Sequence, residues 1–139
     1  ELFIRASSGS YTKAAGEDDQ SIALGITGYK GRVHVHFAAP VSQGLDDSKL
    51  LAAEMDRQIL SGYRLFPVHY LAYAMWAERD PALAVPSAAE LFPAEELRAA
   101  QTEWQRRLDN CPLEQQPYLI LQYANPVRNQ YRIKAGLPL

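Results

Sequence analysis

Apolar and polar residues alternate in one stretch of the chain, between Gly31 and Pro40. The apolar positions are Val33, Val35 and Phe37, and the polar ones are Arg32, His34 and His36. Because successive side chains of a strand point to opposite faces, this pattern predicts a β-strand over 32–38. A single strand needs a partner for its backbone hydrogen bonds. It must pair with part of a longer protein, with a second copy, or with a segment whose pattern indicates helix or loop.

Helical patterns occupy most of the remaining chain. Residues 1–6 are expected to end a helix, 7–19 to form a polar loop, and acidic residues 17–19 to begin a short helix. Asp46 or Asp47 can cap a helix that runs to about Ser61 and stops at Gly62. Its predicted buried face holds Leu51, Met55 and Ile59.

Prolines mark the starts of the later helices. Pro67 is expected to begin a helix that buries Leu71, Ala72 and Met75, and Ser87 with Glu90 matches a capping box. Pro93 and Pro112 open two further helices. The first carries Leu97, Ala100, Trp104 and Leu108, and the second Tyr118, Leu121 and Ala124. Asn125-Pro126 predicts a break, followed by a last short helix through Lys134.

These elements predict a mostly α fold with one strand, divided into 1–44, which contains the strand, and a helical region 45–139. The 139 residues are 47% apolar and 22% charged, which is typical of a globular domain. A net charge of −2 gives no overall attraction to nucleic acid, and a single cysteine excludes an internal disulfide. No apolar run approaches the roughly 18–20 residues that span a bilayer. Because the chain begins at Glu1, inside what resembles a helix, we expect it to be a fragment of a longer protein.

Two groups near the predicted strand are candidates for binding chemistry. Lys30 and Arg32 can hold a phosphate together with glycine backbone donors, or can simply form a solvated strand end. His34 and His36 share one predicted face and can both reach a metal. No nearby Cys, Asp or Glu has the spacing of a third ligand, which favours a polar strand face covered by a helix or by water. We therefore assign no metal and no cofactor.

Further candidates lie in the helical region. His69 is better explained as a hydrogen-bonded interior or boundary histidine than as a catalytic base, and Cys111 has no basic neighbour that would activate its thiol. An aromatic set is most simply a helix core, with a membrane-interface patch as the alternative. It comprises Tyr63, Phe66, Tyr70, Tyr73 and Trp76. A basic helix end consists of Arg128, Arg132 and Lys134. The sequence contains no Gly-x-Ser-x-Gly elbow, P-loop or dinucleotide fingerprint.

The run Gly31-Arg32-Val33-His34-Val35-His36-Phe37, followed by Pro40, resembles the late strand of bacterial glycerolipid acyltransferases. Segments 56–59, 63–67 and 123–129, together with Glu1-Leu2 and the loop at 16–18, resemble a proteobacterial subgroup of 1-acylglycerol-3-phosphate acyltransferases. The resemblance implies phospholipid biosynthesis, in which a fatty acyl group passes from acyl carrier protein or coenzyme A to a lysophospholipid or glycerol phosphate hydroxyl. It also implies a location at the cytoplasmic face of the bacterial inner membrane.

The catalytic motif of that family is missing from the chain. Its base is the His of a His-x-x-x-x-Asp motif, but the residues five positions after His34, His36 and His69 are alanine, valine and alanine. The Glu-Gly-Thr-Arg type phosphate motif is also absent. No catalytic residue is therefore assigned, and the resemblance implies an inactive C-terminal part: the last strand of an α/β domain plus a helical extension. The alternative is a helical module that binds acyl carrier protein, lipid or a second copy.

Overall fold

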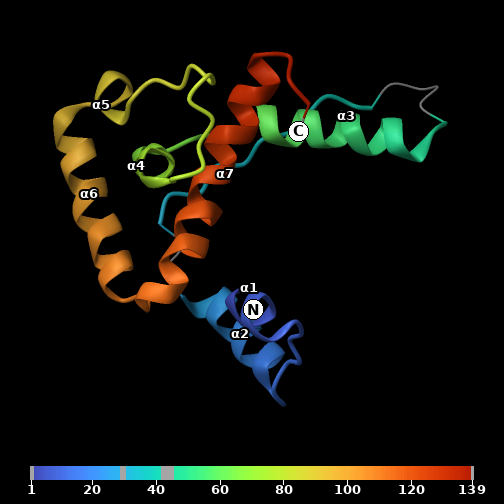
Figure 1. Cartoon of the computed structure of the whole chain (residues 1–139). Helices are drawn as coiled ribbons and strands as arrows, with labels where there is room; N and C mark the ends of the chain where they lie inside the picture. The colour runs from blue at the N-terminus through green and yellow to red at the C-terminus, as the bar shows by residue number, and fades with distance from the viewer. Residues whose placement is uncertain (1, 29–30, 42–45, 139) are drawn as a thin grey trace. The chain divides into compact units, whose positions relative to one another are not determined.

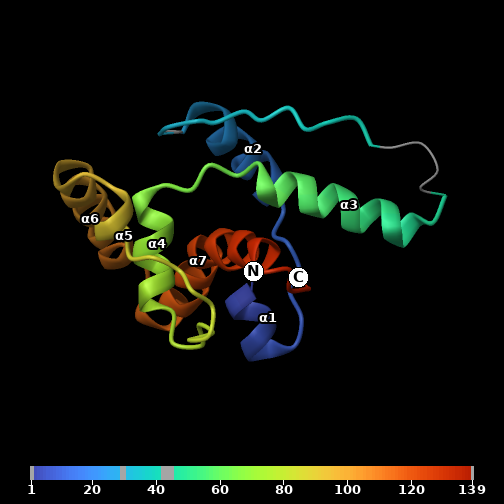
Figure 2. The same cartoon turned by 90° about the horizontal axis from the view of Figure 1, so that it is seen from above.

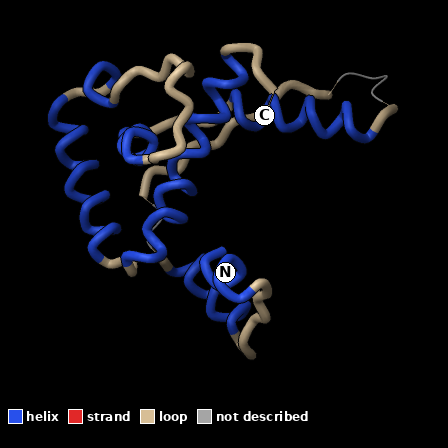
Figure 3. The backbone as a smooth tube through the Cα atoms, viewed as in Figure 1, coloured by secondary structure: helices blue, strands red, loops and turns tan. Residues whose placement is uncertain are grey.

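The computed structural model describes residues 2–28, 31–41 and 46–138. These residues form helices and loops and contain no strand (Figure 3), so the predicted mostly α class is confirmed. They form two compact units, Glu1–Val35 and His36–Leu139. The predicted boundary between 44 and 45 adjoins residues outside the described part of the chain and stays a prediction.

The predicted strand over 32–38 is not present, because the segment is a loop. Its apolar side chains are largely exposed, with exposed fractions of 74% for Val33, 68% for Val35 and 90% for Phe37. A strand is stable only when a neighbouring strand accepts its backbone hydrogen bonds and one face is buried. No strand is assigned among the described residues, so alternation alone does not produce one here.

The N-terminal unit contains α1 (Leu2–Ser8) and α2 (Glu17–Thr27), as the sequence predicted. Glu17 fixes the loop between them, because its carboxylate accepts hydrogen bonds from the Tyr11 hydroxyl and, at 3.0 Å, from the Ala14 amide. These two hydrogen bonds lower the pKa of Glu17. The apolar side chains of α2 remain mostly exposed, including Leu24 at 70% and Ile26 at 76%. Local polar contacts rather than a buried core therefore characterise α2.

Helix α3 (Ser48–Ser61) begins and ends where its sequence predicted. The Asp47 carboxylate accepts hydrogen bonds from the amides of Lys49 at 2.7 Å and Leu50 at 3.3 Å, which satisfies donors that an uncapped helix leaves unpaired. The predicted apolar face is only partly covered. Leu51 is half-buried, whereas Met55 and Ile59 are 46% and 48% exposed.

Helix α4 (Pro67–Met75) is the centre of the C-terminal unit (Figure 1). It lies between α6 (Ala94–Asp109) and α7 (Gln116–Lys134) and contacts both. A short 3-10 helix, η1 (Leu113–Gln115), joins α6 to α7, and α5 (Ala88–Leu91) contacts α4 and α6. The predicted starts at Pro67 and at the Ser87–Glu90 capping box are confirmed.

The core of this unit combines small side chains with aromatic rings. Ala72 of α4 and both Ala124 and Val127 of α7 have no exposed surface. The predicted core role of the aromatic set is confirmed for Tyr70 and Tyr73, which are 7% and 6% exposed. Tyr63 is 46% exposed, and Met75 is 49% exposed although it was predicted to be buried. Its sulfur nevertheless accepts a 3.2 Å hydrogen bond from the indole of Trp104.

The C-terminal end of α3 lies beside α7 (Figure 2), and a buried glutamine joins the two helices. Gln130 of α7 is 8% exposed, and its side-chain amide donates to the carbonyls of Tyr63 at 2.9 Å and Leu60 at 3.2 Å. These carbonyls lie at and beyond the C-terminal end of α3, where the last carbonyls have no amide donor within the helix. The Gln130 side chain shields these carbonyls from water and also donates the hydrogen bonds that they need.

The break predicted at Asn125-Pro126 is wrong, because α7 continues through Pro126. Proline provides no backbone N–H for the carbonyl four residues earlier, at Gln122, so continuation has a cost. The completely buried Ala124 and Val127 lie on either side of Pro126. Packing of this helix face against α4 offsets the lost hydrogen bond, which is a tertiary effect that local sequence does not reveal.

We predict that Pro126→Ala stabilises the C-terminal unit. Alanine restores the backbone N–H inside a continuous helix, which we expect to raise the free energy of unfolding by about 1–2 kcal/mol after the greater freedom of the unfolded chain is subtracted. Urea unfolding followed by circular dichroism measures this change. The control is Pro93→Ala, at the N-cap of α6, where no helical hydrogen bond is gained. If Pro126→Ala gains no more stability than Pro93→Ala, the prediction is wrong.

Candidate functional site

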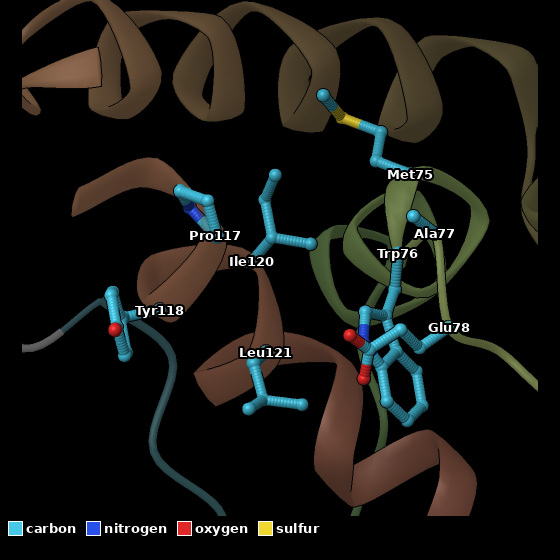
Figure 4. A pocket seen from close by; sticks show the side chains of 8 residues that line it. All are labelled: Met75, Trp76, Ala77, Glu78, Pro117, Tyr118, Ile120 and Leu121. Carbon is cyan, nitrogen blue, oxygen red and sulfur yellow. The ribbon is translucent and has the colours of Figure 1, made fainter. Parts of the chain in front are cut away.

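An apolar pocket lies between the end of α4 and the start of α7 (Figure 4). Its volume is about 390 Å³, within the range of small-molecule sites. Figure 4 shows the side chains of Trp76, Ile120 and Leu121 around it, with Tyr118 on the side opposite Trp76. The complete lining is Met75, Trp76, Ala77, Glu78, Pro117, Tyr118, Ile120 and Leu121. The pocket therefore offers an apolar surface that is open to solvent.

A polar pocket of about 400 Å³ adjoins the apolar one. The two pockets share Trp76, Glu78 and Leu121. The remaining lining of the polar pocket is Asp80, Asn125, Arg128 and Arg132. The two pockets are therefore neighbours, and we call the pair the cleft: its apolar end is the first pocket, and its other end carries charges of both signs.

Helix α7 supplies one wall of this cleft through the helical period. Pro117, Leu121, Asn125, Arg128 and Arg132 follow each other at intervals of three or four residues, so they share one face. The apolar members come first and the cationic members last. At 1.5 Å per residue this stripe extends about 22 Å along the helix. The order of residues in α7 therefore fixes which end of the cleft is apolar.

The charged groups of the polar pocket contact backbone groups and an aromatic ring rather than one another. The Arg128 guanidinium lies 5.6 Å from the centre of the Trp76 ring, and Arg132 donates to the carbonyl of Pro138 at 2.7 Å. Asp80 accepts from the amide of Ala82 at 2.9 Å. Within this lining, no ion pair joins an arginine to Glu78 or Asp80. Both signs of charge are thus available to a bound molecule.

Tyr73 brings a buried hydroxyl to the same region. Its ring meets the Trp76 ring edge-on at a centroid distance of 6.2 Å, and its hydroxyl has no hydrogen-bond partner in the described part of the chain. Burial raises the pKa of Tyr73, and the negative charge of Asp80 raises it further. A buried hydroxyl without a partner costs free energy, but Tyr73 belongs to the lining of neither pocket.

The structure does not gather the site residues predicted near 30–36. Lys30 lies outside the described residues, so a phosphate site with Arg32 stays a prediction. Arg32 and His34 are exposed in the loop of the N-terminal unit. His36 begins the C-terminal unit, and its ring lies so close to Gly62 that a side chain at Gly62 would collide with it. The polar face predicted for His34 and His36 depended on a strand that is not formed.

His69 has a structural role, as predicted. Its Nδ1 accepts a 2.9 Å hydrogen bond from the Phe66 amide, while its own amide donates to the Phe66 carbonyl at 3.0 Å. Its ring stacks on Tyr123 at a centroid distance of 6.1 Å. Burial lowers the pKa of His69, which keeps Nδ1 an acceptor at neutral pH. Cys111 is half-buried with a free thiol.

Residues 2–28, 31–41 and 46–138 contain no cluster of three or more His, Cys, Asp or Glu side chains arranged to hold a metal. None of the helices within those ranges has the length and apolar character needed to cross a membrane.

The cations of the cleft are recognisable in the sequence, but the cleft itself is not. Arg128, Arg132 and Lys134 were grouped as one basic helix end, but only the two arginines line the polar pocket. The Lys134 ammonium instead lies 4.4 Å from the centre of the Tyr131 ring. The stripe from Pro117 to Arg132 was the available signal, and the predicted break at Pro126 concealed it. Trp76 lines both pockets only because α4 packs against α7, and no pattern in the neighbouring sequence indicates this.

Comparisons of the chain with known proteins show no family for it. No protein-family model matches, and no curated protein or solved structure matches either.

We predict that His69 makes stability fall in mild acid. A depressed pKa in the folded state means that the neutral imidazole contributes stability above pH 6.5, the ordinary value, and that this contribution is lost as the pH falls below it. Protonation removes the acceptor for the Phe66 amide, so we expect a loss of about 1 kcal/mol. Thermal unfolding between neutral pH and mild acid measures it.

The variant His69→Gln keeps an acceptor without a titrating ring and should lose less stability in acid than the wild type. His34→Gln is the matched control, because His34 is exposed and its replacement should leave the pH profile unchanged. Parallel profiles for the wild type and His69→Gln would exclude this role of His69.

Proposed function

We propose that this chain is the C-terminal, non-catalytic part of a membrane-associated glycerolipid acyltransferase of phospholipid biosynthesis. The parent enzyme transfers a fatty acyl group from acyl-coenzyme A or acyl carrier protein to a lysophospholipid or glycerol phosphate hydroxyl. It acts at the cytoplasmic face of the bacterial inner membrane. The His-x-x-x-x-Asp segment that supplies the base belongs to another part of that enzyme.

The observation that carries this proposal is the segment from Gly31 to Pro40. Its residues resemble the late strand of these acyltransferases, and its apolar side chains at Val33, Val35 and Phe37 are largely exposed. Such alternation is stable as a strand when a sheet edge accepts its hydrogen bonds and covers its apolar face. A catalytic α/β domain would provide that edge. Lys30 and Arg32, at the start of the segment, would then bind the phosphate of the acceptor.

An alternative is a helical interaction module that binds acyl carrier protein, lipid or a second copy. Exposed apolar side chains on α3, such as Met55 and Ile59, favour an uncovered interaction face. Two of the three arginines of α6 are less available to a partner, since Arg106 and Arg107 both bind Glu103 within their own helix. Binding of acyl carrier protein that weakens with added salt would favour this alternative.

The proposal predicts that the isolated chain has no acyltransferase activity. Acyl transfer to a lysophospholipid is measured with the 139-residue chain and with the natural gene product from which it derives. We expect activity only in a protein that contains the His-x-x-x-x-Asp segment, because the chain has no base at the required spacing. Activity of the isolated chain, or a natural product without that segment, would overturn the proposal.

A second prediction tests the strand through two neighbouring residues of opposite predicted faces. In the natural protein, Val35→Asp should strongly reduce activity and soluble yield, because it would place a charge on the buried face of the strand. His34→Asp, on the other face, should have a small effect. In the isolated chain Val35 is 68% exposed, so both variants should stay within about 0.5 kcal/mol of the wild type. Equal effects in the natural protein would rule out the strand.

A further inference from the structure

The cleft along α7 combines features that a single class of small ligand can satisfy. Its apolar end requires an apolar occupant, because the exposed surface of Trp76, Ile120 and Leu121 gains stability when it leaves water. Its other end carries two guanidinium and two carboxylate groups. Neither end alone specifies a ligand. Because both pockets are lined by Trp76 and Leu121, one molecule with an apolar part and a charged part can occupy both.

We propose that this cleft binds a single-chain amphiphile whose head group carries both a phosphate and an ammonium. The alkyl chain occupies the apolar pocket beside Leu121, and the head group lies in the polar pocket. Arg128 and Arg132 bind the phosphate, since guanidinium forms charge-assisted hydrogen bonds with phosphate oxygens. Glu78 and Asp80 bind the ammonium. This site uses other residues than the phosphate site proposed at Lys30 and Arg32, and its test requires no acyl transfer.

Charge complementarity decides between head groups. A singly charged anion would pair with the arginines but would leave Glu78 and Asp80 facing it with like charge, and a cation would meet the arginines in the same way. A head group with both charges satisfies both pairs.

The size of the cleft favours a small amphiphile over a protein. A stable protein interface buries about 800 Å² on each partner. The apolar pocket is lined by only eight residues and has a volume of about 390 Å³, which is the size of a small-molecule site. A bilayer surface is also less suitable, because a flat surface does not fill a pocket. The ligand is therefore a free amphiphile, and binding to vesicles without binding to the monomeric amphiphile would overturn the proposal.

The experiment is isothermal titration of the 139-residue chain with four dodecyl amphiphiles below their critical micelle concentrations. They share the alkyl chain and differ in the head group: phosphocholine, maltoside, sulfate and trimethylammonium. We expect saturable binding at one site, tightest for dodecylphosphocholine. Equal affinity for the maltoside would overturn the role of the charged pocket, and absence of saturable phosphocholine binding would overturn the site.

Variants separate the two ends of the cleft. Arg128→Gln should weaken phosphocholine binding about tenfold, as expected for one charge-assisted hydrogen bond, and leave maltoside binding unchanged. Arg98→Gln, on the exposed surface of α6, is the matched control. Leu121→Asp should abolish binding of all four amphiphiles, whereas Leu113→Asp, at a residue that is 78% exposed, should not.

Circular dichroism establishes that each variant is folded. If Leu121→Asp does not fold, Leu121→Ala replaces it, with an expected loss of affinity of about tenfold for every head group. Equal loss in the Leu121 and Leu113 variants would indicate non-specific surfactant binding and overturn the proposal. Loss of acyltransferase activity in the natural protein has no bearing on this result, because the titration requires no catalysis.

Discussion

The close contact of α4 with α7 is the interaction on which the C-terminal unit depends. Ala72 on one helix and Ala124 on the other have no exposed surface, and side chains this small allow two helix backbones to approach closely. The remaining elements attach to this pair. The aromatic side of α6 contributes the buried Trp104, and α3 is held through the amide of Gln130. A larger side chain at either alanine would separate the helices that all the others contact.

The same contact creates the cleft. Because α4 ends at Met75 while α7 continues past it, Trp76 comes to lie against the outer face of α7 under the Arg128 guanidinium. The apolar residues of the first turns of α7 then meet the end of α4, and its later arginines extend beyond it. Continuity of α7 through Pro126 is necessary for this arrangement, since a break there would separate Leu121 from Arg128. The packing of α4 against α7 therefore both stabilises the helix around Pro126 and forms the candidate site.

The two units differ in how much of their apolar surface is covered. The C-terminal unit has a buried core, whereas the apolar side chains of α2, and of the loop from Val33 to Phe37 in which the first unit ends and the second begins, remain largely exposed. Exposed apolar side chains in such a contiguous run are typical of surfaces that a further element covers. The exposed loop is the part of the chain for which we propose contact with the acyltransferase sheet. The cleft belongs to the packed C-terminal unit, and for it we propose a separate ligand. The two proposals rest on different residues and on different forces.

Local chemistry in the sequence determined where most helices begin and end. Asp47, Gly62, Pro67 and the Ser87–Glu90 pair act within one helical turn, so their effects follow from neighbouring residues alone. Two predictions failed for the opposite reason. A strand needs a partner distant in sequence, and Pro126 is tolerated only because α4 covers its helix. The cleft likewise joins residues of two helices, so only the tertiary structure decided which arginines face Trp76.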